Sequence, residues 1–184
     1  MRKTCNFQYR FEGEAIEDGS VDVNHLIPSL LALKDALFTF NELLDPDKGK
    51  VILNVKATQN GRFEVQLRMK RKPLVWLATL LKVNKAVDEF TLVKSLFNLT
   101  KLHLWLSGRN PERIDVADDR STVTYYLDGE NHTTDFFTYQ EFRSYRLRTL
   151  ISQFFSPLLQ NGVDRLRLTV GNENIVVETD SEAE

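Results

Sequence analysis

The chain has few of the residues that carry most catalytic and metal chemistry. Its 184 residues include one cysteine and three histidines. A single cysteine, Cys5, excludes an intramolecular disulfide and any zinc site built from paired cysteines. His25, His103 and His132 are far apart in the sequence, and no pair has the spacing of metal ligands. We therefore expect neither a metal nor a cofactor.

Long apolar runs are also missing. The longest nearly charge-free run, residues 73–81, has about half the length that a membrane-spanning helix needs. Residues 1–11 lack the apolar core of a secretory signal. These absences favour a cytoplasmic protein with no membrane span.

Catalytic motifs are absent as well. The sequence contains no glycine-rich phosphate loop, no HExxH, no GxSxG and no series of carboxylates with calcium-binding spacing. Glu12, Glu14, Glu17 and Asp18 are close enough in sequence to form an acid–base pair, but a solvated loop explains them better. Cys5 alternates with aromatic residues, which is typical of a small core side chain. We expect no catalytic residue and no enzyme activity.

Charge is unevenly distributed along a chain whose net charge is −2. Residues 11–50 hold nine acidic and three basic residues, whereas residues 62–113 hold eleven basic and four acidic ones. We expect the two signs to face each other within the fold or to mix across its surface; the alternatives are that they attract an acidic partner or let two copies meet head to tail. Duplex nucleic acid is not expected, because a net negative chain without a continuous basic stripe lacks the necessary potential.

A long amphipathic helix is the strongest local feature. Residues 22–44 carry large apolar residues at intervals of three and four, which fall on one helical face. Asp22 or Asn24 can cap its first turn. Pro28 requires either a helix that starts near His25 or a kink. The stripe consists of Leu26, Leu30, Leu33, Leu37, Phe40 and Leu44.

Strands are predicted on both sides of this helix. Residues 5–12 alternate between apolar and polar side chains, as in a half-buried strand. Residues 51–58 and 63–69 form a hairpin in which a three-residue loop at 59–61 pairs Val55 with Val65 and Leu53 with Leu67.

The remainder of the chain alternates between both kinds of element. Thr138 and Glu141 form a capping box, T-x-x-E, that starts a helix over residues 139–160. The other predicted helices span 74–83 and 88–106, and the other predicted strands span 113–116, 122–127, 131–137, 165–170 and 175–179.

These elements predict an α+β fold with antiparallel sheets packed by long helices. The order β-α-β-β occurs twice, which raises the possibility of a pseudo-repeat with a helical hairpin inserted between its halves. We expect a single domain over residues 1–184. Its expected parts are a first half at 1–72, a helical insert at 73–111, a second half at 112–180 and a tail at 181–184.

One candidate ligand site is basic and aromatic. Two arginines lie one turn apart on the predicted helix 139–160, and two project from one face of the following strand. If that face meets the helix edge, four guanidinium groups would hold an anion such as a phosphate or nucleotide, with residues 70–72 contributing from the other half. Arginines that simply outline exposed faces are the alternative. The set is Arg143, Arg146, Arg165, Arg167 and Tyr139.

A second candidate is an apolar contact surface. The helices predicted at 74–106 are more apolar than a surface hairpin needs, so they are covered either by the sheet or by another chain. A partner protein, or a second copy in a homo-oligomer, would contact Leu74, Trp76, Leu80, Phe97 and Trp105.

The opening of the chain resembles an uncharacterised family of bacterial, prophage and phage-borne proteins. The resemblance lies in a strand that ends at Gly13-Glu14, a V-D-V step at 21–23, an LxPxLLAL core at 26–33, and Asn41 near the end of the helix. Residues 104–114 and 156–166 are also similar, whereas Phe38 and Phe40 depart from the pattern.

The resemblance implies a setting and no chemistry. It suggests mobile elements and phage–host conflict, and it brings no activity, cofactor or catalytic residue. The first functional hypothesis is therefore a non-enzymatic accessory or anti-defence factor that binds a protein partner. The alternative is a module that sequesters a small anion or nucleotide through its arginines.

Overall fold

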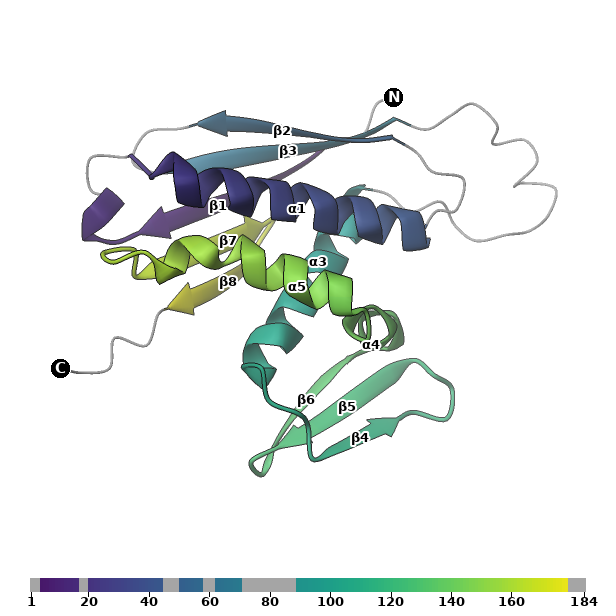
Figure 1. Ribbon diagram of the computed structural model, residues 1–184. Coiled ribbons are helices and arrows are strands. Elements are labelled where there is room, and N and C mark those ends of the chain that lie inside the picture. Colours follow the sequence, from purple (N-terminus) through teal and green to yellow (C-terminus); the bar gives the residue numbers. More distant parts are fainter. Residues whose placement is uncertain (1–3, 17–19, 45–49, 58–61, 71–88, 179–184) are drawn as a thin grey trace.

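The structure is a computed structural model, and it describes residues 4–16, 20–44, 50–57, 62–70 and 89–178. Helices pack on antiparallel sheets, which confirms the predicted α+β class (Figure 1). Two sheets are present in the described residues, one with five strands and one with three.

The N-terminal strand lies at the centre of the larger sheet. β1 pairs antiparallel with β3 on one side and with β7 on the other. β2 and β8 complete the sheet as its outer strands. The strands, in spatial order, are β2 (Lys50–Ala57), β3 (Arg62–Lys70), β1 (Thr4–Glu12), β7 (Arg165–Val170) and β8 (Glu173–Glu178).

The predicted hairpin register is confirmed. Val55 pairs with Val65 and Leu53 with Leu67, as a three-residue loop requires. The strands that flank the loop are described, but the loop at 59–61 itself lies outside the described residues.

Three helices, α1 (Val23–Leu44), α3 (Glu89–Leu106) and α5 (Tyr145–Phe154), cover one face of the larger sheet. Alternate residues of β1 point into the core beneath them, and the ring of Tyr9 lies edge-on to that of Phe154 at 5.9 Å. Ser29 on α1 donates a buried 2.7 Å hydrogen bond to the Phe154 carbonyl. Leu33 is also buried, so the predicted stripe of α1 faces the core.

The start of α1 differs slightly from the prediction. Asp22 caps the helix by accepting a 2.8 Å hydrogen bond from the Asn24 backbone N–H. The helix begins at Val23, so Pro28 lies in its second turn rather than its first.

The smaller sheet has its own core. It contains β4 (Arg113–Val116), β5 (Thr122–Leu127) and β6 (Glu130–Asp135). Side chains from β5 pack against the last two turns of α3. The buried residues of this core are Leu102 and Leu106 from α3, and Val123, Tyr125 and Leu127 from β5.

The order β-α-β-β occurs twice, but the strand pairing does not repeat. β1 joins the five-stranded sheet next to its own hairpin strand β3, whereas β6 belongs to the three-stranded sheet and does not pair with β7 or β8. The pseudo-symmetric arrangement that a duplication would give is therefore not present.

The helix predicted over 139–160 is broken into three pieces. They are α4 (Phe136–Phe142), α5 and the short η2 (Ser156–Leu159). Asp135, not Thr138, caps α4, and it accepts a 2.8 Å hydrogen bond from the Thr138 N–H. Ser144 caps α5 by accepting from the Leu147 N–H, and this second start explains the break.

The end of β1 makes a close contact with the loop that precedes β7. Gly13 has φ of +143°, and a Cβ at that position would lie 2.2 Å from the carbonyl oxygen of Gly162. Two hydrogen bonds of 2.9 Å flank the contact, from Ala15 N–H to Gly162 O and from Asp164 N–H to Glu12 O. The glycine of the family-like GE pair is thus required by both backbone conformation and space.

Gly13→Ala should lower the free energy of unfolding by about 3 kcal/mol, because the new Cβ meets backbone and the residue must keep a conformation that only glycine adopts readily. Gly171→Ala is the matched control: Gly171 also has positive φ, +56°, but a Cβ there meets nothing within 4 Å. Gly171→Ala should lower the free energy of unfolding by about 1 kcal/mol. Equal losses for the two variants in chemical denaturation would contradict the role of the Gly13–Gly162 contact.

Glu141, the predicted capping-box acid, is a core residue instead. Only 6% of it is exposed, and its Oε2 has no hydrogen-bond partner among the described atoms. Burial raises the pKa of Glu141 from 4.5 to about 7. The folded protein therefore keeps this carboxyl group protonated at pH values where the unfolded chain has already lost the proton.

This pKa shift predicts a loss of stability as the pH rises from about 4.5 to about 7, and the loss is complete above that range. Glu141→Gln should remove that component and make the protein more stable than wild type at pH 8 by about 1–2 kcal/mol. The measurement is urea denaturation across this pH range, with the exposed Glu130 changed to Gln as the control. If the stability of the Glu141→Gln variant follows the wild-type pH profile, the assignment is contradicted.

Candidate functional site

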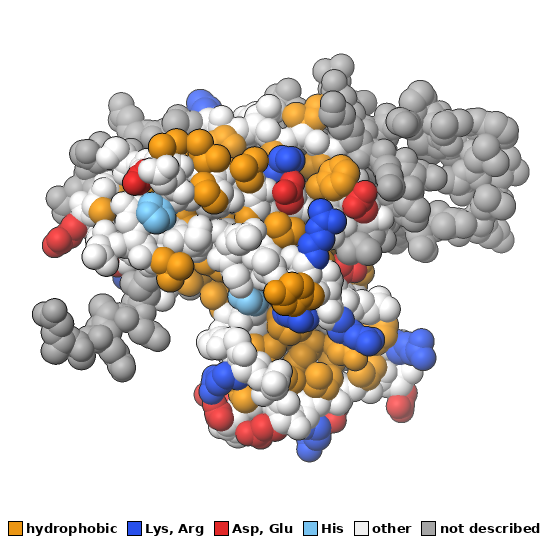
Figure 2. Space-filling model, viewed as in Figure 1, with side chains coloured by type: hydrophobic (Ala, Val, Ile, Leu, Met, Phe, Trp, Pro, Cys, Tyr) orange, Lys and Arg blue, Asp and Glu red, His pale blue; other side chains and the backbone are white. Residues whose placement is uncertain are grey.

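One flank of α1 carries a second apolar stripe, next to the one that enters the core. Val23, Ile27, Leu31 and Phe38 are between 42% and 55% exposed. Their spacing of four, four and seven residues places them along one side of the helix. Figure 2 shows apolar side chains gathered along this visible side of α1. A contiguous exposed apolar stripe is typical of an interaction surface.

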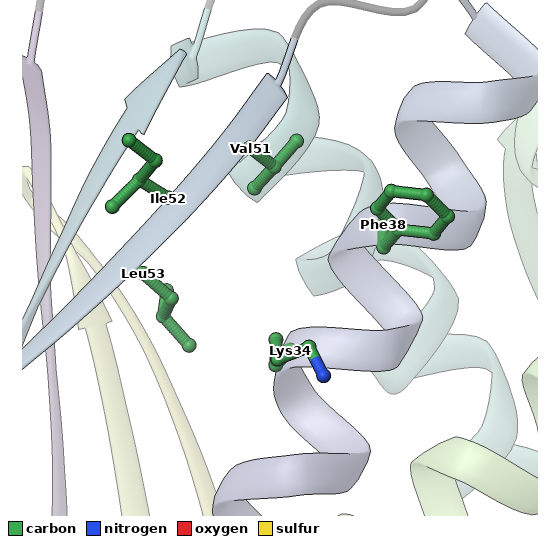
Figure 3. A pocket seen from close by; sticks show the side chains of 5 residues that line it. All are labelled: Lys34, Phe38, Val51, Ile52 and Leu53. Carbon is green, nitrogen blue, oxygen red and sulfur yellow. The ribbon is translucent and has the colours of Figure 1, made fainter. Parts of the chain in front are cut away.

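A pocket of about 320 Å³ lies between this side of α1 and β2. Its lining comes from both elements, and Figure 3 shows Lys34 and Phe38 on α1 across from Val51 and Leu53 on β2. Ile52, which belongs to the other face of the strand, completes the lining. The pocket is thus mainly apolar, with one cationic side chain at its wall.

β2 is an outer strand of the five-stranded sheet. Among the described strands only β3 pairs with it, so its other edge presents backbone N–H and C=O groups without a strand partner. Val55, which lies on the same side of β2 as the core, is 41% exposed. We define the docking surface as the stripe of α1, the pocket, and this edge of β2.

The predicted arginine cluster is not formed. Arg143 follows α4, with its guanidinium carbon 5.9 Å from the ring centre of Tyr139, and Arg146 is exposed on α5. Arg165 and Arg167 lie on the face of β7 that points away from the helices, because the residues that alternate with them are buried in the core. The helices and this face of the sheet are on opposite sides, so the four guanidinium groups do not meet.

Two arginines of that set instead have new partners. Arg165 contacts Glu12 at 3.4 Å and Glu178 at 2.7 Å, and Arg167 contacts Glu12 at 3.7 Å. Glu12 comes from β1, a strand that sequence reasoning could not place beside β7. Of the predicted residues 70–72, only Lys70, the last residue of β3, belongs to the described part of the chain.

Two of the predicted apolar contact residues lie in the described part of the chain, and they do not form an exposed surface. Phe97 is 2% exposed and lies in the main core, because α3 passes beneath α1 and runs on into the smaller core. Trp105 is half-buried and stacks on His132 at 5.5 Å. Leu74, Trp76 and Leu80 lie outside the described residues.

A serine–histidine contact is present between α3 and α5. Ser152 Oγ lies 3.2 Å from His103 Nε2, and it also donates a 3.1 Å hydrogen bond to the Arg148 carbonyl. Burial, and secondarily the charge of Arg148, lower the pKa of His103. A nucleophile needs a base that is itself oriented by an acceptor. No described hydrogen bond joins His103 to a carboxylate, and we interpret the contact as a link between two helices.

The described residues contain no group of three His, Cys, Asp or Glu side chains that could hold a metal ion. Within the same residues no helix has the length and apolar character needed to cross a membrane.

Comparison with known proteins adds no relative. No protein-family model matches the chain, and neither a curated protein nor a solved structure is significantly similar to it.

Proposed function

We propose that the protein acts by binding another protein rather than by catalysis, and that the partner occupies the docking surface of α1 and β2. The observation that carries this proposal is the side-by-side position of an exposed apolar stripe, a pocket and a strand edge with which no described strand pairs. An extended segment that adds to β2 gains backbone hydrogen bonds, and its alternate side chains reach toward α1.

The side chains of the docking surface predict which residue types the partner segment carries. Val51, Leu53 and Val55 face the α1 side of β2, so the partner strand needs apolar residues at alternate positions there. The pocket beside Phe38 accepts one apolar side chain, and the ammonium group of Lys34 favours an acidic residue next to it.

A second copy of the chain meets the apolar part of this description, although its β2 offers no acidic residue to Lys34. If β2 pairs antiparallel with itself about Asn54, Leu53 lies opposite the second copy's Val55, so apolar side chains meet on the α1 side. A pairing about Leu53 would instead put Lys50 opposite Lys56, and like charges directly opposite are unfavourable. The same two-fold axis brings the two α1 stripes together, as an isologous interface requires.

The setting that we propose is the cytoplasm of a bacterial cell, in which the protein serves as an accessory or anti-defence factor of a phage or mobile element. This follows from the family resemblance of residues 13–41. A factor of this kind needs binding surfaces more than reactive groups, in keeping with the docking surface.

Light scattering after size exclusion should give a dimer at micromolar concentrations. Leu31→Glu and Val55→Glu should each raise the dimer dissociation constant by about 10–100-fold, because a charge would be buried in an apolar interface. Leu159→Glu is the matched control, since Leu159 is 85% exposed and belongs to η2, outside the docking surface. It should leave the dimer unchanged.

The register can be tested directly. In a Cys5→Ser background, Asn54→Cys should form an intermolecular disulfide on mild oxidation, since the two positions face each other across the axis. Lys56→Cys should do so much less. A wild-type monomer at all accessible concentrations, or equal cross-linking of both cysteine variants, would contradict self-association through β2.

A further inference from the structure

The face of the larger sheet that points away from the helices is polar and open. On β1 the residues of this face alternate with the buried aromatic ones, and Asn6 and Gln8 are exposed. None of the described helices covers it, since α1, α3 and α5 all belong to the core on the other side. Side chains on this face are therefore available to solvent and ligands.

Two arginines lie side by side on the central strands β1 and β7. Arg10 on β1 is directly opposite Arg167 on β7. Residues opposite each other on antiparallel strands have Cβ atoms about 5 Å apart, and like charges in such pairs destabilise a sheet. This pair of arginines therefore requires negative charge close to it.

One carboxylate supplies part of that charge. Glu12 lies 3.4 Å from Arg10 Nε, 3.4 Å from Arg165 Nη1 and 3.7 Å from Arg167 Nε. Its side chain is 20% exposed, so it lies low among the longer arginines, which are 35–44% exposed. Arg165 also contacts Glu178. Three cations, Arg10, Arg165 and Arg167, therefore share the carboxylates of Glu12 and Glu178.

Donor capacity remains on two of these arginines. Among the described residues, neither Arg10 nor Arg167 donates a hydrogen bond to a protein acceptor, and their contacts with Glu12 are ion pairs without hydrogen-bond geometry. A guanidinium group has five N–H donors in a planar fork that matches phosphate and carboxylate oxygens. Two such forks on adjacent strands are close enough to hold one oxyanion between them.

We propose that Arg10 and Arg167, next to Arg165, form a binding site for a phosphate group on the open face of the sheet, where the Glu12 carboxylate partly neutralises them. The site lies on a different face from the α1 stripe and does not depend on the proposed protein–protein interaction. A doubly charged phosphate suits the site better than a carboxylate, because the site combines the guanidinium groups of Arg10, Arg165 and Arg167.

The surroundings define what the site recognises. By strand alternation, no aromatic residue lies on this face of any of the five strands. A base or sugar therefore has no ring to stack on, unlike single-stranded nucleic acid on aromatic platforms. The site should bind the phosphate group of a small molecule with little preference for what is attached to it.

The test is isothermal titration of the full chain at low ionic strength with inorganic phosphate, adenosine monophosphate and adenosine as three separate ligands. Phosphate and the monophosphate should bind with similar affinity, and adenosine should not bind. Arg10→Ala and Arg167→Ala should each weaken phosphate binding by about tenfold or more. The control Arg146→Ala removes an exposed arginine on the helix side and should change nothing.

The Glu12→Gln variant distinguishes between two interpretations of the arginines, a ligand site and a structural ion-pair network. The change removes the internal carboxylate that competes with phosphate, so affinity should rise several-fold, whereas a purely structural network would show no phosphate binding at any stage. Arg10→Lys keeps the charge but loses the forked guanidinium group, so its affinity for phosphate should lie between those of wild type and Arg10→Ala. Circular dichroism checks that each variant is folded. Absence of phosphate binding by wild type, or unchanged affinity in a folded Arg167→Ala variant, would overturn the proposal.

Discussion

The pairing of β1 with strands from both ends of the chain is the constraint on which the rest of the structure depends. β1 lies between β3 and β7, so among the described strands it is the one that pairs with both the first hairpin and the last. The close approach of Gly13 to Gly162 ends the β1–β7 ladder at a defined point. That end point determines that Leu168 lies opposite Tyr9 in the core and Arg167 opposite Arg10 on the open face.

Local sequence patterns predicted the elements well and their long-range pairing poorly. The alternation of apolar and polar side chains predicted β1, and the three-residue length of the loop predicted the Val55–Val65 register. Both features depend only on residues that are close in sequence. The sheet that β6 joins depends on contacts with distant segments, which no local pattern contains. The break before α5 did have a local signal, since Ser144 is a good N-cap, but the apolar periodicity continues through it and concealed it.

The candidate sites illustrate the same limit. Arg165 and Arg167 were correctly placed on one face of a strand, but which face meets the helices depends on the burial of Leu166 and Leu168. Their shared partner Glu12 is 153 positions away from Arg165 in the sequence. The outer stripe of α1 was present in the sequence at the spacing of a helix, but the larger stripe on the core side dominated the pattern. That β2 is an outer strand is a property of topology alone.

The separate core of the three-stranded sheet has a consequence for how the molecule opens. Five buried side chains form this core, and it is joined to the main body through the end of α3 and the break between α4 and α5. Among the described residues this core has far fewer buried side chains than the main core, so we expect β4, β5 and β6 to form a cooperative unit of lower stability. Thermal fluctuations of the native state should open the three-stranded sheet, so its amide protons should exchange with solvent while those of the five-stranded sheet stay protected.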